Sequence, residues 1–390
     1  MPLLTRRRLL ASKIETTYGV DPVPTGAANA ILLSDLEVTP QDADFADRGL
    51  IRPYLGRSEQ LPAGIRAMVK AGVELQGSGT AGTAPGWGPL LRGCGFSETL
   101  SAAAVTGTAQ AGTTTSITLA AAGTSAVDGF YVGMPIRITG GTGSGQSAFI
   151  SAYNGTSKVA TVSPAFGVAP TGTSTYSIDA CVVYKPISTG FESLTHYFQL
   201  DGVQHRILGS RGSVSLSLKK KEIPKLNFEF TGLYQPVVDS ALFTPIFTAF
   251  KTPLPVTNLN TSGLVVHGFS GASAVMSSMD IDIANTIVHR DLVGGSQAVL
   301  ITDREPSGSV MIEATLVAQK DWWTAAQSAL LNTLSITHGT TAGSKVAINS
   351  FNTQITNPRY ADEDGVSMLQ MDTQFIPSTA GNDELYITVF

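Results

Sequence analysis

The sequence predicts a mainly β fold, built from two tandem β-sandwich or barrel modules that each carry one short helix, plus a small inserted β domain. Three observations support this prediction. Large apolar and polar residues alternate over long runs, the composition is rich in glycine and poor in charge, and one order of strand and helix signals occurs twice. Period-two alternation places large side chains on one face of a sheet and polar ones on the other, so each module should have one buried and one wet face.

The clearest alternation lies between Thr195 and Tyr234. Asp201-Gly202 is a two-residue hairpin signal, because a type I′ turn needs positive φ angles that Asp-Gly adopts at low cost. Serines then alternate with large apolar residues, and beyond the charged turn at 219–222 a second run alternates in the same way. The apolar positions are Val214, Leu216, Leu218, Leu226, Phe228 and Phe230. The pattern predicts an antiparallel meander with one buried face.

Length and composition limit the class of protein. The chain has 390 residues, enough for two or three domains, and it is 43% hydrophobic, so it can bury a core. Charged residues make up 14%, below the roughly 25% of average globular chains. The formal charge of −5 argues against a general nucleic-acid-binding surface, which is usually basic. Cys94 and Cys181 lack metal-ligand spacing and are expected to be buried free thiols, with a bridge between them as the alternative.

No segment of the sequence indicates a membrane or secretion signal. No run approaches the roughly 18 apolar residues of a membrane helix. The basic residues 6–8 are not followed by an apolar segment of the kind found in signal peptides. We therefore expect a soluble protein with no membrane partner that matures in a cytoplasm.

The first half of the chain begins with an extended arm, followed by strand and helix signals. Asp35, Glu37 and Thr39 alternate with apolar residues, which predicts a strand with an acidic face. A loop covers 42–62, and loops of that length are usually functional or mobile. A strand over 65–75 comes next, and then a short helix. The apolar face of that helix consists of Trp87, Leu90, Leu91 and Cys94.

Residues 105–178 differ in composition from the segments on either side. The segment consists mostly of Thr, Ser, Gly and Ala, and its charged residues are Asp128, Arg137 and Lys158. Short strand signals separated by Gly and Asn turns still run through it. We therefore expect a small β domain inserted between the helix and the meander of the first module.

The second half repeats the signals of the first half in the same order. Asp280 and Asp282 lie on a strand with an acidic face, and Asp321 can N-cap a short helix. The apolar face of that helix is expected to be Trp323, Ala326 and Leu330. The shared order predicts residues 1–104 plus 179–245 as the first module, 105–178 as the inserted domain and 246–390 as the second module.

No motif in the sequence assembles a catalytic, cofactor or metal site. The Gly-rich run 140–147 resembles a phosphate-binding loop, but Gln146 stands at the Lys position and strand signals flank the run, so a hairpin loop is expected. The five histidines show no paired-ligand spacing, and His196 is expected to pack in the core or lie on the surface. There is no GxSxG nucleophile motif. Trp322 and Trp323 could stack on sugars or bases, but their helical setting favours a core role.

Acidic residues recur on the predicted polar strand faces. A solvent surface usually mixes both signs of charge, whereas Lys is nearly absent from these faces. A functional surface is therefore favoured over a merely solvated one. The acidic residues are Asp35, Glu37, Glu229, Asp280, Asp282 and Asp372.

Three segments carry a resemblance to a known family: KIETTYGVDPVPTGAANAILLSDLEV, DGVQHRILGSRGSVSLSLKKKEIPKLNFEFTG and NTQITNPRYADEDGVSMLQMDTQFIPS. They resemble the major tail tube proteins of long-tailed, siphovirus-type bacteriophages, over nearly all of the chain outside 105–178. The resemblance implies a β-sandwich-like module with one helix, rings whose inner sheets join as a barrel, and stacked rings that conduct the genome. It also implies a tape measure protein and a tail terminator as partners, a place in the virion tail and assembly in the host cytoplasm. The second module and the inserted domain depart from the simplest family pattern.

On this resemblance the chain is a structural tail tube subunit without catalysis, and the alternative is a carbohydrate- or receptor-binding phage β-protein. A basic wall would bind DNA through counterion release, so most of the six acidic residues are expected to face the pore. If rings carry six modules, a two-module chain closes a ring with three copies, and the alternative is a hexamer of full chains. The loop over 42–62 and the matching stretch 286–305 are expected to bridge stacked rings, and the inserted domain to be dispensable for tube formation.

Overall fold

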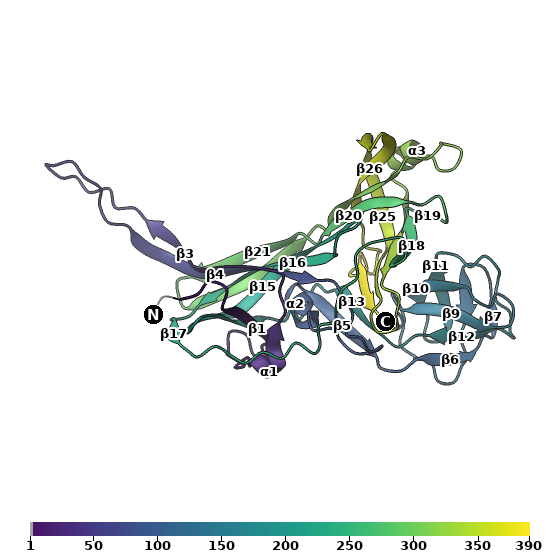
Figure 1. Cartoon of the computed structure of the whole chain (residues 1–390), viewed down its shortest axis with the longest axis horizontal. Coiled ribbons are helices and arrows are strands. Elements are labelled where there is room, and N and C mark those ends of the chain that lie inside the picture. The colour runs from purple at the N-terminus through teal and green to yellow at the C-terminus, as the bar shows by residue number, and fades with distance from the viewer. Residues whose placement is uncertain (1–2) are drawn as a thin grey trace.

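The computed structural model describes residues 3–390 and is mainly β. Within these residues the helices are short: α1 (Gly26–Asn29), α2 (Gly88–Gly93) and α3 (Trp322–Gln327). The molecule is elongated, with a long hairpin projecting at one end and the inserted domain at the other (Figure 1). The predicted fold class is confirmed.

The first module has two layers of antiparallel strands that share one long strand. Strands β2, β1, β14 and β15 follow one another in one layer, and strands β3, β4, β16 and β15 in the other. The bounds are β1 (Arg8–Ile14), β2 (Ala30–Ile31), β3 (Asp35–Ala46), β4 (Leu61–Glu74), β14 (Leu194–Leu200), β15 (Val203–Lys219) and β16 (Lys225–Tyr234). The predicted meander is β14, β15 and β16, with Asp201 and Gly202 at φ 41° and 110° in its first turn.

The second module repeats each of these pairings. Strands β19, β18, β24 and β25 form one layer, and strands β20, β23, β26 and β25 form the other. The bounds are β18 (Thr261–Val266), β19 (Phe269–Ser270), β20 (Met276–Asp282), β23 (Ser307–Glu313), β24 (Leu331–His338), β25 (Val346–Glu363) and β26 (Val366–Phe375). Since α3 precedes β24 as α2 precedes β14 in the first module, the internal repeat predicted from the sequence is present in the fold.

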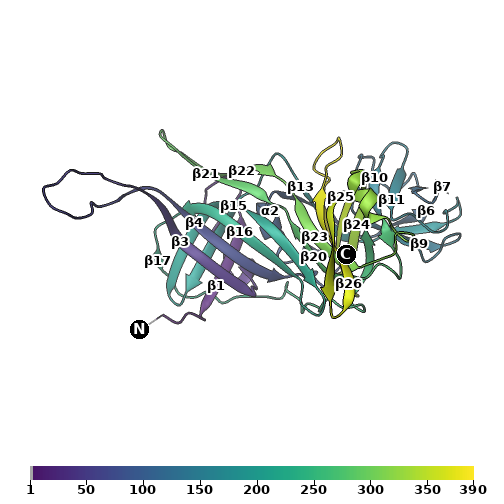
Figure 2. The same cartoon turned by 90° about the horizontal axis from the view of Figure 1, so that it is seen from above.

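The two modules share one continuous sheet because β15 pairs with β20. Across this junction Ser215 lies opposite Asp282, Leu216 opposite Ile281 and Ser217 opposite Asp280. The resulting eight-stranded sheet has the order β3, β4, β16, β15, β20, β23, β26 and β25 (Figure 2). In the part of the chain that the structure describes, β3 pairs with β4 alone and residues 356–363 of β25 pair with β26 alone, so both outer edges of the sheet are free.

The other layers are joined by strands from the ends of both modules. Strand β27 (Tyr386–Val389), the last of the chain, lies between β25 and β13 (Cys181–Pro186), and β13 pairs in turn with β5 (Phe96–Ser101). A short strand β17 (Val238–Asp239) pairs with the start of β15. The C-terminal strand therefore binds the first module to the second.

Both modules bury the apolar face that the alternation predicts. Phe228 and Phe230 are almost fully buried against the β4 side chains, and Trp87 of the α2 turn is fully buried. The prediction for the second helix was wrong by one residue. Trp322 and Ala325 are buried, whereas Leu330 lies exposed beyond the end of the helix. Asp321 does cap this helix, because its carboxylate accepts a hydrogen bond from the Thr324 backbone N–H at 3.0 Å.

The inserted segment forms a separate seven-stranded sheet in the order β6, β12, β9, β10, β11, β8 and β7. The bounds are β6 (Val105–Thr108), β7 (Ala111–Gly112), β8 (Ser116–Thr118), β9 (Pro135–Gly140), β10 (Ser147–Tyr153), β11 (Val159–Ser163) and β12 (Thr175–Ile178). The Gly-rich run 140–147 connects the antiparallel pair β9 and β10, as expected for a hairpin loop.

The inserted domain shares an apolar core with strands of both modules. Cys181 and Val183 of β13, together with Tyr386 and Phe390 of the chain end, are buried in the same cluster as the apolar residues of the insertion. The Phe149 and Phe390 rings lie 6.1 Å apart, edge to face. The insertion is therefore packed on the body, and its removal would uncover apolar side chains that the sequence did not associate with it.

Replacement of residues 105–178 by a short Gly/Ser linker should reduce soluble yield and lower the midpoint of thermal unfolding, because it exposes Val183, Tyr386 and Phe390. Adding Tyr386→Thr and Phe390→Ser to the linker variant should restore much of the soluble yield, since exposed apolar surface is then reduced. Soluble fraction and thermal unfolding compare the two variants with the full chain. A plain linker variant as soluble and stable as the full chain would show that the shared core contributes little.

Candidate functional site

The polar face of the eight-stranded sheet is the candidate functional surface. Along one row of laterally paired residues, Asp35 of β3 and Asp282 of β20 are connected through Gly72, Asn227 and Ser215. Side chains in one such row point to the same face, and so do residues two apart along a strand. All six acidic residues singled out in the sequence therefore lie on one face, opposite the apolar core.

These carboxylates are mostly open to solvent. Asp35, Glu37, Glu229 and Asp282 are exposed, and Asp280 and Asp372 are half-buried. Asp280 accepts a hydrogen bond from Ser217 Oγ at 2.6 Å across the junction between the modules. The face thus continues without interruption from the first module to the second.

Basic side chains alternate with the acidic ones on this face. Lys225 Nζ lies 3.0 Å from Asp35 Oδ2, and Lys70 Nζ lies 2.7 Å from Glu229 Oε1. Arg359 Nη1 lies 3.1 Å from Asp372 Oδ1. The expectation that Lys is nearly absent from the acidic faces was therefore wrong. Lys225 and Asp35 lie on strands separated by β4, and Lys70 and Glu229 are 159 positions apart in sequence, so these two pairings depend on the register between strands.

The ion pairs change the charge state of the face little. The hydrogen bond from Lys225 lowers the pKa of Asp35, and the hydrogen bond to Glu229 raises the pKa of Lys70. Lys70 lies opposite both Glu37 and Glu229 on its two neighbouring strands, so one cation serves two carboxylates. Exposed pairs of this kind stabilise the fold by only about 0–1 kcal/mol each. The face stays acidic but mixed, with basic groups engaged by carboxylates.

A second feature is the hairpin of β21 (Asn285–Leu292) and β22 (Ser296–Arg304), which lies between β20 and β23. It packs over the first module. Asn285 Nδ2 donates hydrogen bonds to the Cys94 and Gly212 carbonyl oxygens at 2.7 and 2.9 Å. Arg211 Nη1 donates to the Val299 carbonyl oxygen at 2.9 Å, and the Val299 N–H donates to Tyr18 Oη at 2.6 Å. The stretch 286–305, expected to bridge rings, is thus bound within its own chain.

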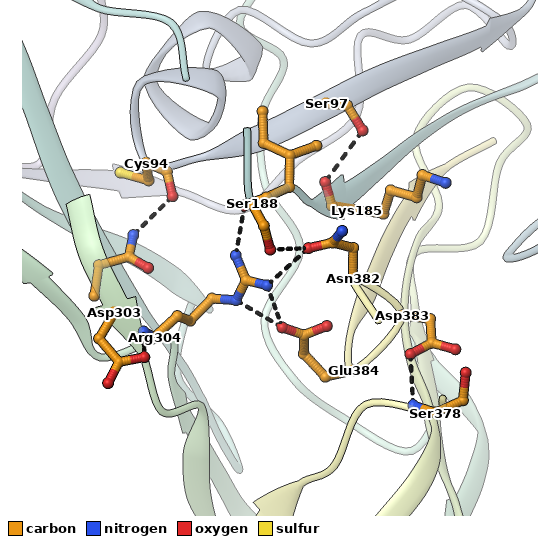
Figure 3. A network of polar contacts seen from close by, with 12 residues as sticks. Cys94, Ser97, Lys185, Ser188, Asp303, Arg304, Ser378, Asn382, Asp383 and Glu384 are labelled. Carbon is orange, nitrogen blue, oxygen red and sulfur yellow. Dashed lines mark hydrogen bonds and ion pairs between the residues drawn. The ribbon is translucent and has the colours of Figure 1, made fainter. Parts of the chain in front are cut away.

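Arg304, at the base of this hairpin, binds the hairpin to two other segments of the chain (Figure 3). Its guanidinium contacts Glu384 Oε1 at 2.5 and 2.6 Å and donates to the Ile187 carbonyl oxygen at 2.8 Å. A longer bond of 3.3 Å reaches Asn382 Oδ1, which also accepts from Ser188 Oγ. The Arg304 and Glu384 side chains are only 11% and 4% exposed. This buried pair joins the second module's hairpin, the β13–β14 connection and the C-terminal segment.

The equivalent hairpin of the first module is a free arm. Between β3 and β4, residues 47–60 extend away from the body (Figures 1 and 2), and Ile51 and Leu55 are fully exposed. At the base of the arm the Arg66 guanidinium forms ion pairs with Asp42 at 2.7 Å and with Asp44 at 3.0 Å. The strands continue further into this segment than the predicted loop of 42–62 allowed.

The described residues contain no cluster of three or more His, Cys, Asp or Glu side chains able to hold a metal ion. Burial lowers the pKa of His196 to about 3, so its imidazole is neutral and packs against the Phe230 ring. Burial raises the pKa of Cys94 and of Cys181, and both cysteines are free. Among residues 3–390, no helix is long and apolar enough to cross a membrane.

Comparison with known proteins identifies the family. A family model described as phage tail tube protein matches residues 5–374. The chain belongs to the phage tail tube protein family. No curated protein matches the chain. As a tail tube protein it is a structural component of the virion tail that assembles into a tube, and a continuous sheet with two free edges is an architecture suited to such assembly.

Breaking the buried pair between Arg304 and Glu384 should strongly destabilise this tail tube protein. Arg304→Met leaves the Glu384 carboxylate buried without its cation, which costs about 3–5 kcal/mol in the free energy of unfolding. The double variant Arg304→Met with Glu384→Leu should recover most of this loss. Arg137→Met at the exposed pair with Asp179 is the matched control, expected to cost at most about 1 kcal/mol. Urea unfolding measures the free energy of unfolding of all three variants. Equal losses for Arg304→Met and Arg137→Met would contradict the stabilising role of the Arg304–Glu384 pair.

Proposed function

We propose that three copies of this chain close into a ring, that the eight-stranded sheets join as one barrel around a pore, and that stacked rings conduct the phage genome during ejection. The observation that carries the proposal is that both modules have the same strand order and already join edge to edge in one sheet. A third module added in the same way would continue the sheet, and six modules supplied by three chains would close it. The six-module count comes from the family resemblance.

The assignment of segments follows from this proposal. Residues 1–104 plus 179–245 form the first module, 246–390 the second and 105–178 the insertion, which is consistent with β6–β12 pairing only among themselves in the described chain. The insertion lies on the layer opposite the polar face, on the outside of such a tube. The protein would act in tails of the siphovirus type, assembled in the host cytoplasm, with a tape measure protein and a tail terminator as its partners.

Ring composition tests the proposal directly. Native mass spectrometry of purified rings should give species of three chains, because each chain supplies two modules. End-on views in electron microscopy should show six-fold features that are truly three-fold, with three projecting insertions. Six full chains in each ring would refute the two-module arrangement, and a stable monomer at high concentration would refute self-assembly.

The charge of the polar face tests its assignment to the pore. Phage particles that carry Asp280→Lys and Asp282→Lys should form tails of normal length but release DNA more slowly, since a basic wall binds phosphates by counterion release. Raised salt should relieve the delay, because screening shortens the range of the attraction. Asp280→Asn with Asp282→Asn should have a smaller effect.

The matched control places the same charge change elsewhere. Ala121→Lys with Ala122→Lys changes the net charge of an exposed bend of the insertion by +2, which equals the change that the double Asn variant makes on the face. Release by this control should equal that of the unmodified phage. Equal rates of DNA release by the control and by the Lys variant of the face would contradict the assignment of that face to the pore.

A further inference from the structure

We propose that the internal junction between β15 and β20 is repeated between copies: residues 359–361 of β25 pair antiparallel with residues 37–39 of β3 in the next copy, with Tyr360 opposite Val38. This inference rests on the proposed ring and specifies its closing contact. The occupant of both free edges is a second copy of this chain, because the two edges are the repeats of the two strands that meet inside the chain.

The repeat fixes which part of β25 is involved. The first part of β15 pairs with β14, and its last part, Ser215–Lys219, pairs with β20. In the same way the first part of β25 pairs with β24, and residues 356–363 have no strand on that side within the described chain. The open half of β25 is therefore the counterpart of the half of β15 that binds the second module.

Two alignments of the modules give the same register. The first alignment matches the last residues of β4 and β23, Glu74 and Glu313. Glu74 pairs with Lys225 on β16, and Glu313 pairs with Met368 on β26, so Lys225 corresponds to Met368. Matching the ends of β15 and β25, at Lys219 and Glu363, gives the same register, because both alignments place Ser217 with Ala361.

The equivalent strand positions follow from this register. On β15 and β25, Ser215, Leu216 and Ser217 correspond to Arg359, Tyr360 and Ala361, because their partners on β16 and β26 correspond. On β20 and β3, Asp280, Ile281 and Asp282 correspond to Glu37, Val38 and Thr39, because their partners on β23 and β4 correspond. Since Leu216 lies opposite Ile281 inside the chain, Tyr360 should lie opposite Val38 of the next copy.

Side chains at the internal junction are more deeply buried than their counterparts at the free edges. Leu216 and Ile281 are 5% and 2% exposed where they meet. At the free edge Tyr360 is 65% exposed, although the centroid of its ring lies 5.5 Å from that of Trp323 in α3. Pairing with β3 of the next copy would cover Tyr360 with Val38, which is half-buried in the single chain. An apolar residue on the core face of an unpaired edge marks a place where another strand adds.

Charge on the polar face agrees with this register. Arg359 would lie opposite Thr39 of the next copy, and its diagonal neighbour on the same face would be Glu37. Diagonal positions across antiparallel strands lie within reach of long side chains, and opposite charges there are favourable. The arrangement adds one acidic neighbour to Arg359, which already pairs with Asp372.

The position of the free arm in the ring can be inferred from its counterpart, the β21–β22 hairpin. Inside the chain, the hairpin that follows β20 lies over the preceding module and buries Val299 and Ile301 there. The arm of residues 47–60 follows β3 in the equivalent position, so it should lie over the second module of the adjoining copy. Ile51 and Leu55 would then be covered within the ring, whereas the sequence alone predicted contact with the next ring.

Disulfide trapping tests the register. Tyr360→Cys with Val38→Cys should form interchain bonds on mild oxidation of assembled rings, giving dimers and closed trimers on non-reducing gels. Leu216→Cys with Ile281→Cys is the matched control, because it places the same pair at the internal junction and should give an intrachain bond. Tyr360→Cys with Leu36→Cys, shifted by two residues, should crosslink several-fold less. The wild-type chain shows the background from its own two cysteines.

A second pair guards against a variant that fails to fold or has unfavourable bond geometry. Arg359→Cys with Thr39→Cys occupies the adjacent position, and adjacent antiparallel pairs alternate between hydrogen-bonded and non-hydrogen-bonded geometry. One of the two pairs should therefore trap efficiently. Rings of three chains without crosslinks in either pair, or with stronger crosslinks in the shifted pair, would overturn this register and leave the proposed function standing. Absence of rings in the wild-type chain would overturn the proposed function itself.

Discussion

The pairing of β15 with β20 is the contact on which the architecture depends. Without it each module would be a separate sandwich with its own exposed edges, and exposed edges invite uncontrolled association. With it the polar faces of two modules become one surface and their apolar faces become one core. The contact joins β15, at one edge of the first module's polar layer, to β20, at the opposite edge of the second module's polar layer, so it is heterologous. A heterologous contact leaves one copy of each edge free and must either close into a ring or continue without limit.

The division of β15 between two layers requires a bend, and a buried carboxylate holds it. Gly209 adopts φ +58°, next to the point where the ladder with β16 shifts register. Its N–H donates to Glu15 at 2.7 Å, and the same carboxylate accepts from Gly19 N–H, Ser193 Oγ and Thr195 Oγ1 at 2.6–2.7 Å. A buried carboxylate is tolerated only when its oxygens are satisfied in this way. Glu15, which directly follows β1, thereby fixes the place at which β15 changes layer.

Sequence reasoning succeeded where the signal is local. Side-chain parity along a strand depends only on neighbours in sequence, so Asp280 and Asp282 could be assigned to a polar face without knowing their partners. The Asp201-Gly202 turn and the repeated order of elements are also local signals. Lys70 and Glu229 are 159 positions apart, and their meeting depends on the register between β4 and β16. The sequence contains no signal for that register, so it does not predict that Lys70 pairs with Glu229 on a face where Lys was expected to be nearly absent.

The docked hairpin and the insertion were missed for the same reason. Asn285 reads as an ordinary loop residue until the fold brings it to the Cys94 carbonyl, nearly two hundred positions away. The insertion looked detachable because its composition differs from that of its surroundings. Its contact with Phe390 joins segments that only the C-terminal strand brings together. Local composition indicates where a domain begins and ends, but not what it covers.

Fusion of two modules in one chain has a consequence for assembly. In a ring of the proposed kind, every second junction is intramolecular, so its formation carries no loss of translational freedom and draws on a high effective concentration. Three junctions rather than six then depend on protein concentration. The fused junctions are also free to differ from the others. The β21–β22 hairpin is held by Arg304 and Asn285 in a permanent contact, whereas its counterpart arm stays exposed in the single chain, where it can engage only after another copy arrives. In the proposed ring, divergence of the two hairpins would thus separate a contact made during folding from one made during assembly.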